Sequence, residues 1–310
     1  MIPPEFPVQL SLLRTEFEDH VKDIRPELHR YCSRILGSVF DAEDVVQEAL
    51  AKAFYYLPTT TVSNMRGWLF RVAHNKAMDH LRLSGKEVTS ELDEVAATEP
   101  ELPLERKDTI EFALSYLLKL TVKQRCCVVL KDVLDHSLAE ISELLDASIS
   151  EIKASLHRGR TRLRELSQVP QPEAPLLDSR QTQLLQTYVE LFNARDFDAV
   201  RALLADDVRL DLVNRFQRQG AEVDPYFTRY SQADQWSFAT GLVDSLPAML
   251  IYDNASNTPV LHSFVLPTWR GEKIAEIRDY LFVPYVIESA TVVKLAGELS
   301  RIARVLGEDL

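Results

Sequence analysis

The sequence contains little of what marks cross-linked, metal-bound or membrane-spanning proteins. It has three cysteines and nine glycines among 310 residues. Three cysteines cannot all pair and cannot supply the four ligands of a structural zinc ion, so we predict no disulfide framework and no metal or other cofactor. The longest stretch without Asp, Glu, Lys or Arg, residues 254–269, is shorter than the roughly 20 residues of a membrane helix and contains two prolines. We expect no membrane association.

The N-terminal segment also lacks an uninterrupted apolar run. Charges at Glu5 and Arg14 break the apolar core that a secretory signal requires. The cytoplasm is therefore the expected compartment.

Positive charge is scarce overall but concentrated in two segments. The formal net charge is −12, which argues against a chain that binds DNA by itself, because binding to phosphates requires Lys and Arg. Yet residues 66–86 carry five basic residues and one acidic residue, and residues 153–164 carry five basic residues and no acidic one. This distribution predicts contacts with nucleic acid made as part of a larger complex.

Two segments without helical periodicity divide the chain. Residues 85–108 are rich in acidic residues, and residues 167–180 contain three prolines, so both are predicted to be linkers. Residues 1–84 and 109–166 have apolar residues at helical spacing and are predicted to be all-α. Residues 181–310 are predicted to be an α+β domain. Its expected elements are a helix over 181–205, strands over 208–213, 248–252, 260–266 and 274–286, and a terminal helix over 290–306.

An amphipathic helix is expected from Asp41 to Leu57, with Asp41 as its N-cap. Its apolar stripe leaves four polar side chains on the outer face, where they are candidates for a functional contact: Asp44, Gln47, Glu48 and Lys52. A face that is only solvated is the alternative interpretation.

The helix expected from Asn64 to Leu83 places Trp68, Arg71 and Asn75 on one face. An outward indole next to Arg and Asn side chains can stack on an unpaired base and hydrogen-bond to its edge. The alternative is that Trp68 is half-buried packing.

A helix-turn-helix spacing follows in the second helical part. Residues 138–145 and 149–163 carry inward apolar stripes, the second through Ile149, Ile152, Leu156 and Leu163, and residues 146–148 form the turn between them. The period of 3.6 places other side chains of the second helix opposite its stripe, available to a major groove: Glu151, Ala154, Ser155, Arg158 and Arg162. Flanking residues would reach phosphates: Lys153, His157 and Arg160.

Three sequence blocks together resemble extracytoplasmic-function (ECF) sigma factors of bacterial RNA polymerase. Residues 41–57 resemble the polymerase-binding helix of that family, residues 64–82 its promoter-melting helix, and residues 120–166 its upstream-promoter reader. The resemblance implies polymerase contacts in the first block by Asp41, Asp44, Gln47 and Glu48. It implies DNA contacts in the melting region by Asn64, Arg66, Trp68, Arg71, Asn75, Lys76 and Arg82, and in the reader by the helix-turn-helix residues given above.

The C-terminal part resembles a different family. Residues 184–213 are similar to the cone-shaped α+β domains related to SnoaL-like polyketide cyclases, which in some sigma factors follow the DNA reader and regulate it. A pocket in such a domain would be lined from the concave face of the sheet. The polar and aromatic candidates are Asp211, Tyr226, Tyr230, Trp236, His262, Arg278 and Tyr280, of which we select Trp236, His262, Arg278 and Tyr280. His262 is a candidate base that Asp279 would orient.

Taken together, these features predict a sigma factor that is not an enzyme. Core RNA polymerase and promoter DNA are its expected partners, and the C-terminal domain is expected to modulate it in cis, with or without a small-molecule ligand. Two alternatives remain. One is a helix-turn-helix regulator that acts alone and has a ligand-sensing C-terminal domain, and the other is a SnoaL-like enzyme with a DNA-binding appendage.

Overall fold

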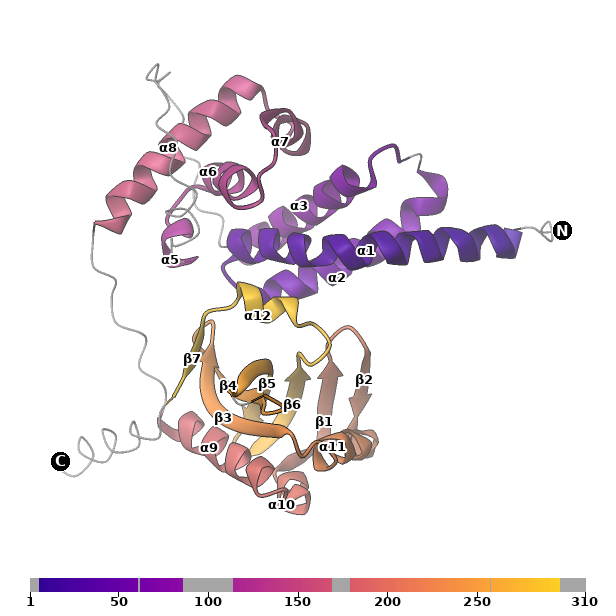
Figure 1. The fold of residues 1–310 in the computed structure, drawn as a ribbon, viewed down its shortest axis with the longest axis vertical. Helices are drawn as coiled ribbons and strands as arrows, with labels where there is room; N and C mark the ends of the chain where they lie inside the picture. Colours follow the sequence, from indigo (N-terminus) through magenta and orange to yellow (C-terminus); the bar gives the residue numbers. More distant parts are fainter. Residues whose placement is uncertain (1–5, 61, 86–113, 169–178, 257, 296–310) are drawn as a thin grey trace. The chain divides into compact units, whose positions relative to one another are not determined.

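The computed structural model describes residues 6–60, 62–85, 114–168, 179–256 and 258–295 (Figure 1). The chain forms two compact units, residues 1–172 and 173–310, and each has its own hydrophobic core. The acidic linker predicted from Gly85 to Asp108 lies, after its first residue, outside the described residues. Among the described residues, no helix combines the length and the apolar character needed to cross a membrane.

Three long helices open the first unit: α1 (Phe6–Leu36), α2 (Val39–Tyr56) and α3 (Met65–Leu83). The 3-10 turn Leu57–Thr59 follows α2. The N-cap of α2 is Ser38, whose hydroxyl accepts a hydrogen bond from the Asp41 amide at 3.1 Å. The prediction that Asp41 is the cap was wrong, because the helix begins one turn earlier than the apolar stripe indicated.

The second helical part consists of α5 (Leu114–Leu117), α6 (Val122–Val128), the π-helical turn Val129–Val133, α7 (Leu138–Leu145) and α8 (Ile149–Ser167). The helix-turn-helix spacing is confirmed, since residues 146–148 separate α7 from α8. Both helices begin with a capping box, and Asp146 ends α7 in the left-handed conformation at φ 51°.

Both helical parts contribute to one hydrophobic core. It includes Leu28 and Leu69 from the first part and Cys127 and Leu156 from the second. The Arg125 guanidinium is 3% exposed and donates to backbone carbonyls of both parts, including that of Ile35. Because a buried charge is costly unless it is hydrogen-bonded, these bonds from the two Nη atoms of Arg125 stabilise the packing of α6 against the end of α1.

The second unit is built on a seven-stranded sheet in the order β2-β1-β6-β5-β4-β3-β7. The strands are β1 (Leu204–Leu212), β2 (Phe216–Gln219), β3 (Trp236–Val243), β4 (Leu246–Asp253), β5 (Val260–Arg270), β6 (Lys273–Asp279) and β7 (Val292–Lys294). β1 and β6 pair in parallel, and the other neighbours are antiparallel. The predicted α+β class is confirmed, but the strand pattern did not predict β2 or β3.

Helices flank this sheet: α9 (Ser179–Asn193), α10 (Phe197–Ala202), α11 (Asp224–Ser231) and α12 (Tyr285–Ser289), with the 3-10 turn Gly220–Val223 before α11. α9 packs on β3 and β4 (Figure 1). Phe192 at its end contacts the rings of Tyr230 and Phe238 at centroid distances of 5.3 and 5.2 Å. These aromatic contacts anchor the helical layer on the sheet.

Three predictions for this unit were wrong. The strand expected over 274–286 ends at Asp279, and residues 285–289 form the helix α12. The helix expected over 181–205 is interrupted at Arg195, which has φ 59° and donates to the carbonyls of Ala233 and Trp236. The terminal helix expected over 290–306 does not form in its described part, because residues 292–294 are the strand β7, which pairs with β3; residues 296–310 lie outside the described residues. For both expected helices a long-range contact overrides the local helical pattern.

Candidate nucleic-acid interface

Ion pairs join the outer face of α2 to α3. The four side chains predicted to contact a protein partner are half-buried or exposed on α2: Asp41, Asp44, Gln47 and Glu48. Lys76 Nζ donates to Glu48 Oε2 at 2.9 Å, and His80 Nε2 lies 3.6 Å from Asp41 Oδ2. The acidic face of α2 and the basic face of α3 therefore form one polar surface.

The seven residues predicted for the melting region lie at the start and along the length of α3. Five are exposed and two, Trp68 and Lys76, are half-buried; the exposed ones are Asn64, Arg66, Arg71, Asn75 and Arg82. Asn64 caps the helix, since its Oδ1 accepts from the Gly67 amide at 3.0 Å. Trp68 packs partly against the core of the first unit. Asn75 makes no hydrogen bond with any described residue, so its amide is available to a ligand.

Three arginines of α3 are already paired within the chain. Arg66 pairs with Glu27, and Arg82 pairs with Asp79 at 2.7 Å. Arg71 Nη2 donates to the Glu143 carbonyl of α7 at 2.8 Å. Exposed pairs of this kind stabilise a protein by about 0–1 kcal/mol, so a nucleic-acid phosphate can replace the protein partner at little cost.

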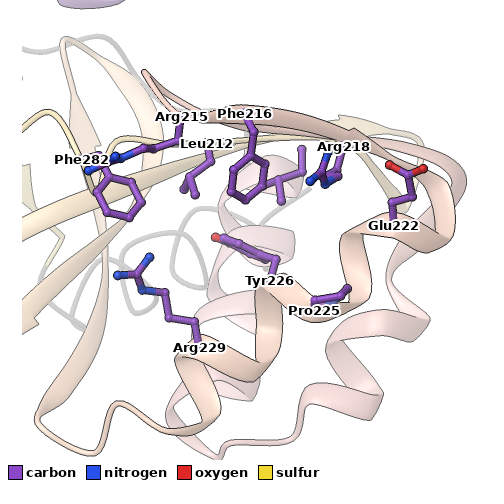
Figure 2. Close-up of a pocket in the computed structure, with 10 residues that line it drawn as sticks. Leu212, Arg215, Phe216, Arg218, Glu222, Pro225, Tyr226, Arg229 and Phe282 are labelled. Atoms are coloured by element: carbon purple, nitrogen blue, oxygen red, sulfur yellow. The ribbon is translucent and has the colours of Figure 1, made fainter. Parts of the chain in front are cut away.

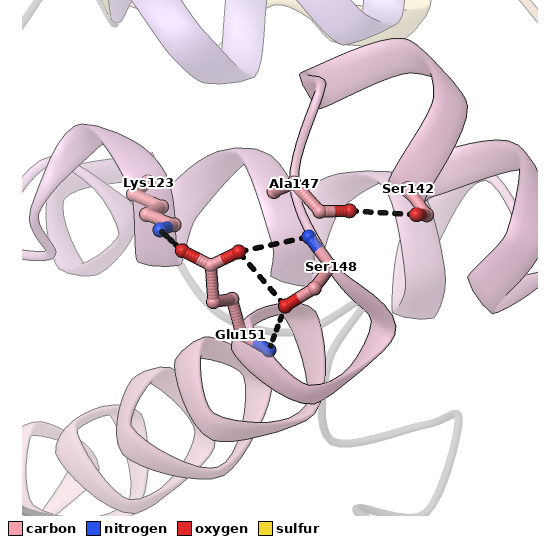
Figure 3. Close-up of polar contacts among 5 residues, drawn as sticks. All are labelled: Lys123, Ser142, Ala147, Ser148 and Glu151. Atoms are coloured by element: carbon pink, nitrogen blue, oxygen red, sulfur yellow. Dashed lines mark hydrogen bonds and ion pairs between the residues drawn. The ribbon is translucent and has the colours of Figure 1, made fainter.

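The turn from α7 to α8 is held by a compact set of hydrogen bonds (Figure 3). The Glu151 carboxylate accepts from the amide and the hydroxyl of Ser148, both at 2.8 Å, and from Lys123 Nζ at 3.3 Å. Ser142 Oγ donates to the Ala147 carbonyl at 2.6 Å. The hydrogen bond from the Ser148 amide is the main cause that lowers the pKa of Glu151 to about 2. The carboxylate of Glu151 is thus occupied by its own turn.

α8 presents a different face from the one predicted. Ser155, predicted to face outward, is 1% exposed, and Ile149, predicted to face inward, is 46% exposed. A Cβ added to Gly159 would lie 2.9 Å from Val128 Cγ2, so α8 approaches α6 most closely along the line through Ser155 and Gly159. Ile149 begins the helix ahead of that contact. Both predictions were wrong because the packing of α6 sets the rotation of α8.

The remaining residues of α8 divide by exposure. Ala154, His157, Arg158 and Arg160 are half-buried, whereas Glu151, Lys153 and Arg162 are exposed. Arg160 makes a two-pronged ion pair with Asp132, with Nη2–Oδ1 at 2.7 Å and Nε–Oδ2 at 3.0 Å. Ile149 and Ser150 are also exposed at the start of α8, and the sequence analysis did not place them on the outer face. Their position directly after the Ser148 cap, in the first turn of the helix, was the available signal of this exposure.

The residues predicted to line a pocket in the second unit fall into two pairs. The rings of Trp236 and His262 stack at 5.6 Å. Arg278 Nε lies 3.3 Å from Asp211 Oδ2, and its guanidinium is 5.7 Å from the centre of the Tyr280 ring.

Asp279 does not orient His262 among the described residues. Its buried carboxylate accepts from the hydroxyls of Tyr226 at 3.0 Å and Tyr230 at 2.6 Å, and from the Leu281 amide at 2.9 Å. Burial raises the pKa of Asp279 despite these donors. The predicted orienting role was wrong, because α11 brings two tyrosines onto the end of β6.

Comparison with known proteins places the first unit in a family. The Sigma-70 region 2 model matches residues 20–87, and the Sigma-70, region 4 model matches residues 113–163. The ECF RNA polymerase sigma factor SigW of Bacillus subtilis is 34% identical over 168 residues, which span 48% of this chain and 87% of that protein. SigG of Mycobacterium tuberculosis, also an ECF sigma factor, is 30% identical over 217 residues, 60% of this chain and 58% of that protein.

A solved structure of the extracytoplasmic function sigma factor SigJ of Mycobacterium tuberculosis is 20% identical, with a TM-score of 0.35, and the match covers 84% of this chain and 95% of that one. On the strength of the region models and of SigW, the chain belongs to the ECF RNA polymerase sigma factors, which are DNA-binding proteins of transcription initiation. The resemblance seen in the three N-terminal sequence blocks is thereby confirmed.

Proposed function

We propose that this chain binds core RNA polymerase, opens promoter DNA and reads an upstream promoter element, and that its C-terminal unit modulates these steps in cis. The observation that carries the proposal is that the capped helix-turn-helix and the α2–α3 pair, with its exposed Asn75, occupy one compact unit. Residues 1–84 would bind polymerase and open DNA, residues 109–166 would read DNA, and residues 181–310 would regulate.

The polymerase contact is assigned to the outer face of α2. Asp44 and Gln47 lie on that face, where Asp44 is half-buried and Gln47 is exposed. Replacing both by Ala should reduce co-purification with core polymerase about tenfold or more, since each lost charged or polar contact weakens binding. The matched control is Lys52→Ala, an exposed residue further along the same helix. Equal retention of polymerase by both variants would contradict the assignment.

The DNA contacts are assigned to the side chains that remain accessible. In α3 these are Arg66, Arg71, Asn75 and Arg82 with the exposed part of Trp68, and in α8 they are Lys153, His157, Arg158 and Arg162. Arg158 is the proposed base-reading residue, because a guanidinium binds a guanine edge through two hydrogen bonds. Arg158→Ala should lower discrimination among upstream elements by about 1–3 kcal/mol, whereas Lys153→Ala should weaken binding to all sequences evenly. Footprinting across promoter variants separates the two outcomes.

The second unit is proposed to be a SnoaL-like regulatory domain without catalytic activity. Its helices before β1 and its mixed sheet support this assignment, and its separate core allows it to act as an independent body. Because it is tethered, it meets the first unit at an effective concentration of about millimolar, so weak contacts suffice for regulation.

Truncation tests the regulatory role. A chain ending at Pro172 keeps the first unit, and promoter-dependent transcription with core polymerase should differ several-fold from that of the full chain. Adding residues 173–310 as a separate fragment is the matched control and should restore the full-length level only at high concentration. Equal transcription by the truncated and full chains at every salt concentration would exclude modulation in cis.

A further inference from the structure

The second unit contains a cavity that no sequence motif indicated (Figure 2). It measures about 500 Å³ and lies between the β1–β2 hairpin, α11 and the segment after β6. This volume is within the roughly 300–1,000 Å³ typical of small-molecule sites. Of the pocket candidates named from the sequence, Tyr226 lines it, whereas none of the four selected residues does.

The floor of the cavity is apolar and aromatic. Leu210 and Leu212 from β1 and Tyr226 from α11 are buried, and Phe282 is half-buried. The Tyr226 hydroxyl donates to the buried Asp279, which fixes the orientation of the ring. Such a floor favours a flat apolar body, because aromatic rings gain contact area and stacking energy from one another.

Three arginines surround the mouth, and one of them, Arg229, lies within electrostatic range of the buried Asp279. Arg215, Arg218 and Arg229 are exposed, and within the described residues none of their side chains makes an ion pair or hydrogen bond; Glu222 is the single acid in the lining. Residues 171–310 contain 20 acidic and 13 basic residues, so this cluster is positively charged within an acidic part of the chain. A cluster of guanidinium groups without partners favours a bound anion.

Stacking holds two of these guanidinium groups in place. The Arg215 and Arg229 guanidinium carbons lie 4.4 and 4.7 Å from the centre of the Phe282 ring, and Arg218 lies over Phe216 at 4.9 Å. These cation–π contacts hold the guanidinium groups near the rings and use none of their N–H donors, which remain available to an acid group.

We propose that this cavity binds an organic anion in which a single carboxylate or phosphate is attached to an aromatic body, with the acid group at Arg215, Arg218 and Arg229 and the body on Tyr226 and Phe282. The site is separate from the polymerase and DNA contacts proposed above, so its test does not depend on them.

Two fluorescent probes with the same ring system test the proposal on the full chain. The anionic probe is 1-anilinonaphthalene-8-sulfonate, and the neutral probe is N-phenyl-1-naphthylamine. The anionic probe should bind at least about tenfold more tightly, although it is the less apolar of the two. Arg215→Gln and Arg229→Gln should each weaken its binding about tenfold and leave the neutral probe nearly unchanged.

The matched control is Arg209→Gln. Arg209 is exposed on β1 between Leu210 and Val208, and strand alternation turns it away from the face that carries Leu210. All these substitutions are at exposed positions, so circular dichroism should show a folded chain. Tighter or equal binding of the neutral probe, or an equal loss in Arg209→Gln, would overturn the proposal.

Displacement of the anionic probe distinguishes the two acid groups. 1-Naphthoate and 1-naphthyl phosphate share one body, and the one that displaces the probe at the lower concentration identifies the preferred head group. Displacement by uncharged 1-naphthalenemethanol at the same concentration as both anions would show an apolar site without anion selectivity and would refute the proposal.

Discussion

The pairing of Arg160 with Asp132 decides between two roles for a basic residue of the reading helix. The sequence predicts a phosphate contact for Arg160. In the structure, both side chains are 11% exposed, and the guanidinium forms two hydrogen bonds to the carboxylate. Asp132 lies in the π-helical turn between α6 and α7. The pair therefore fixes the middle of α8 against the turn that precedes the first helix of the motif.

The expected loss of stability follows from the charge that each single replacement leaves unpaired. Removing one partner of a buried ion pair leaves the other charge without compensation, which costs about 3–5 kcal/mol. Because this pair is slightly exposed, we take the lower end of that range. Arg160→Met and Asp132→Leu should each destabilise the first unit by about 3 kcal/mol. The double variant removes both charges. Its loss of stability should be smaller than the sum of the two single losses, by about 2 kcal/mol or more.

Urea unfolding followed by far-ultraviolet circular dichroism measures these differences, with duplex promoter affinity recorded at several salt concentrations. Arg162→Met is the matched control, because Arg162 is 53% exposed and pairs only with Glu165 among described residues. It should change stability by less than about 0.5 kcal/mol. The reasoning fails if Arg160→Met leaves stability unchanged and instead lowers affinity for all sequences with a salt slope reduced by about one unit.

Three further predictions concern the helical unit. Trp68→Ala and Asn75→Ala should leave polymerase binding intact and reduce open-complex formation, because each base stacked on an aromatic ring contributes about 1–3 kcal/mol; a defect equally severe on a pre-melted template would contradict this. Ser148→Ala should lower the stability of the reading motif by about 1 kcal/mol, measured by thermal melting, because it removes the N-cap of α8. Burial lowers the pKa of His29 and His74 from 6.5 to about 4. The folded chain therefore disfavours the charged forms of both histidines, whereas the unfolded chain binds protons below pH 6.5. The free energy of unfolding should be highest above pH 6.5 and should fall towards pH 4 by about 1.4 kcal/mol per pH unit for each histidine. Urea titrations that give equal stability at about pH 7 and about pH 5 would refute the last prediction.

The sequence alone determined the features that depend on neighbours within one helical turn. The helix-turn-helix was predictable because its signals involve only residues up to four positions apart. These signals are the cap at Ser148, the apolar stripe that follows it and the left-handed turn at Asp146. The same holds for α3, which begins directly after Asn64. The family resemblance rests on these local patterns, which is why it could be recognised before the structure.

Only the tertiary structure decided which side of each element is free. Ser155 is buried because Gly159 lets α6 approach, and Arg160 is paired because the π-helical turn places Asp132 beside it. The three arginines around the cavity of the second unit come from the β1–β2 hairpin and from α11, and the ring on which two of them stack follows β6. Such contacts join residues tens of positions apart, and no periodicity within a single element contains information about them. The packing of whole elements therefore decides how a helix is rotated, which charges pair and where a cavity forms. The local sequence decides that the helices themselves form.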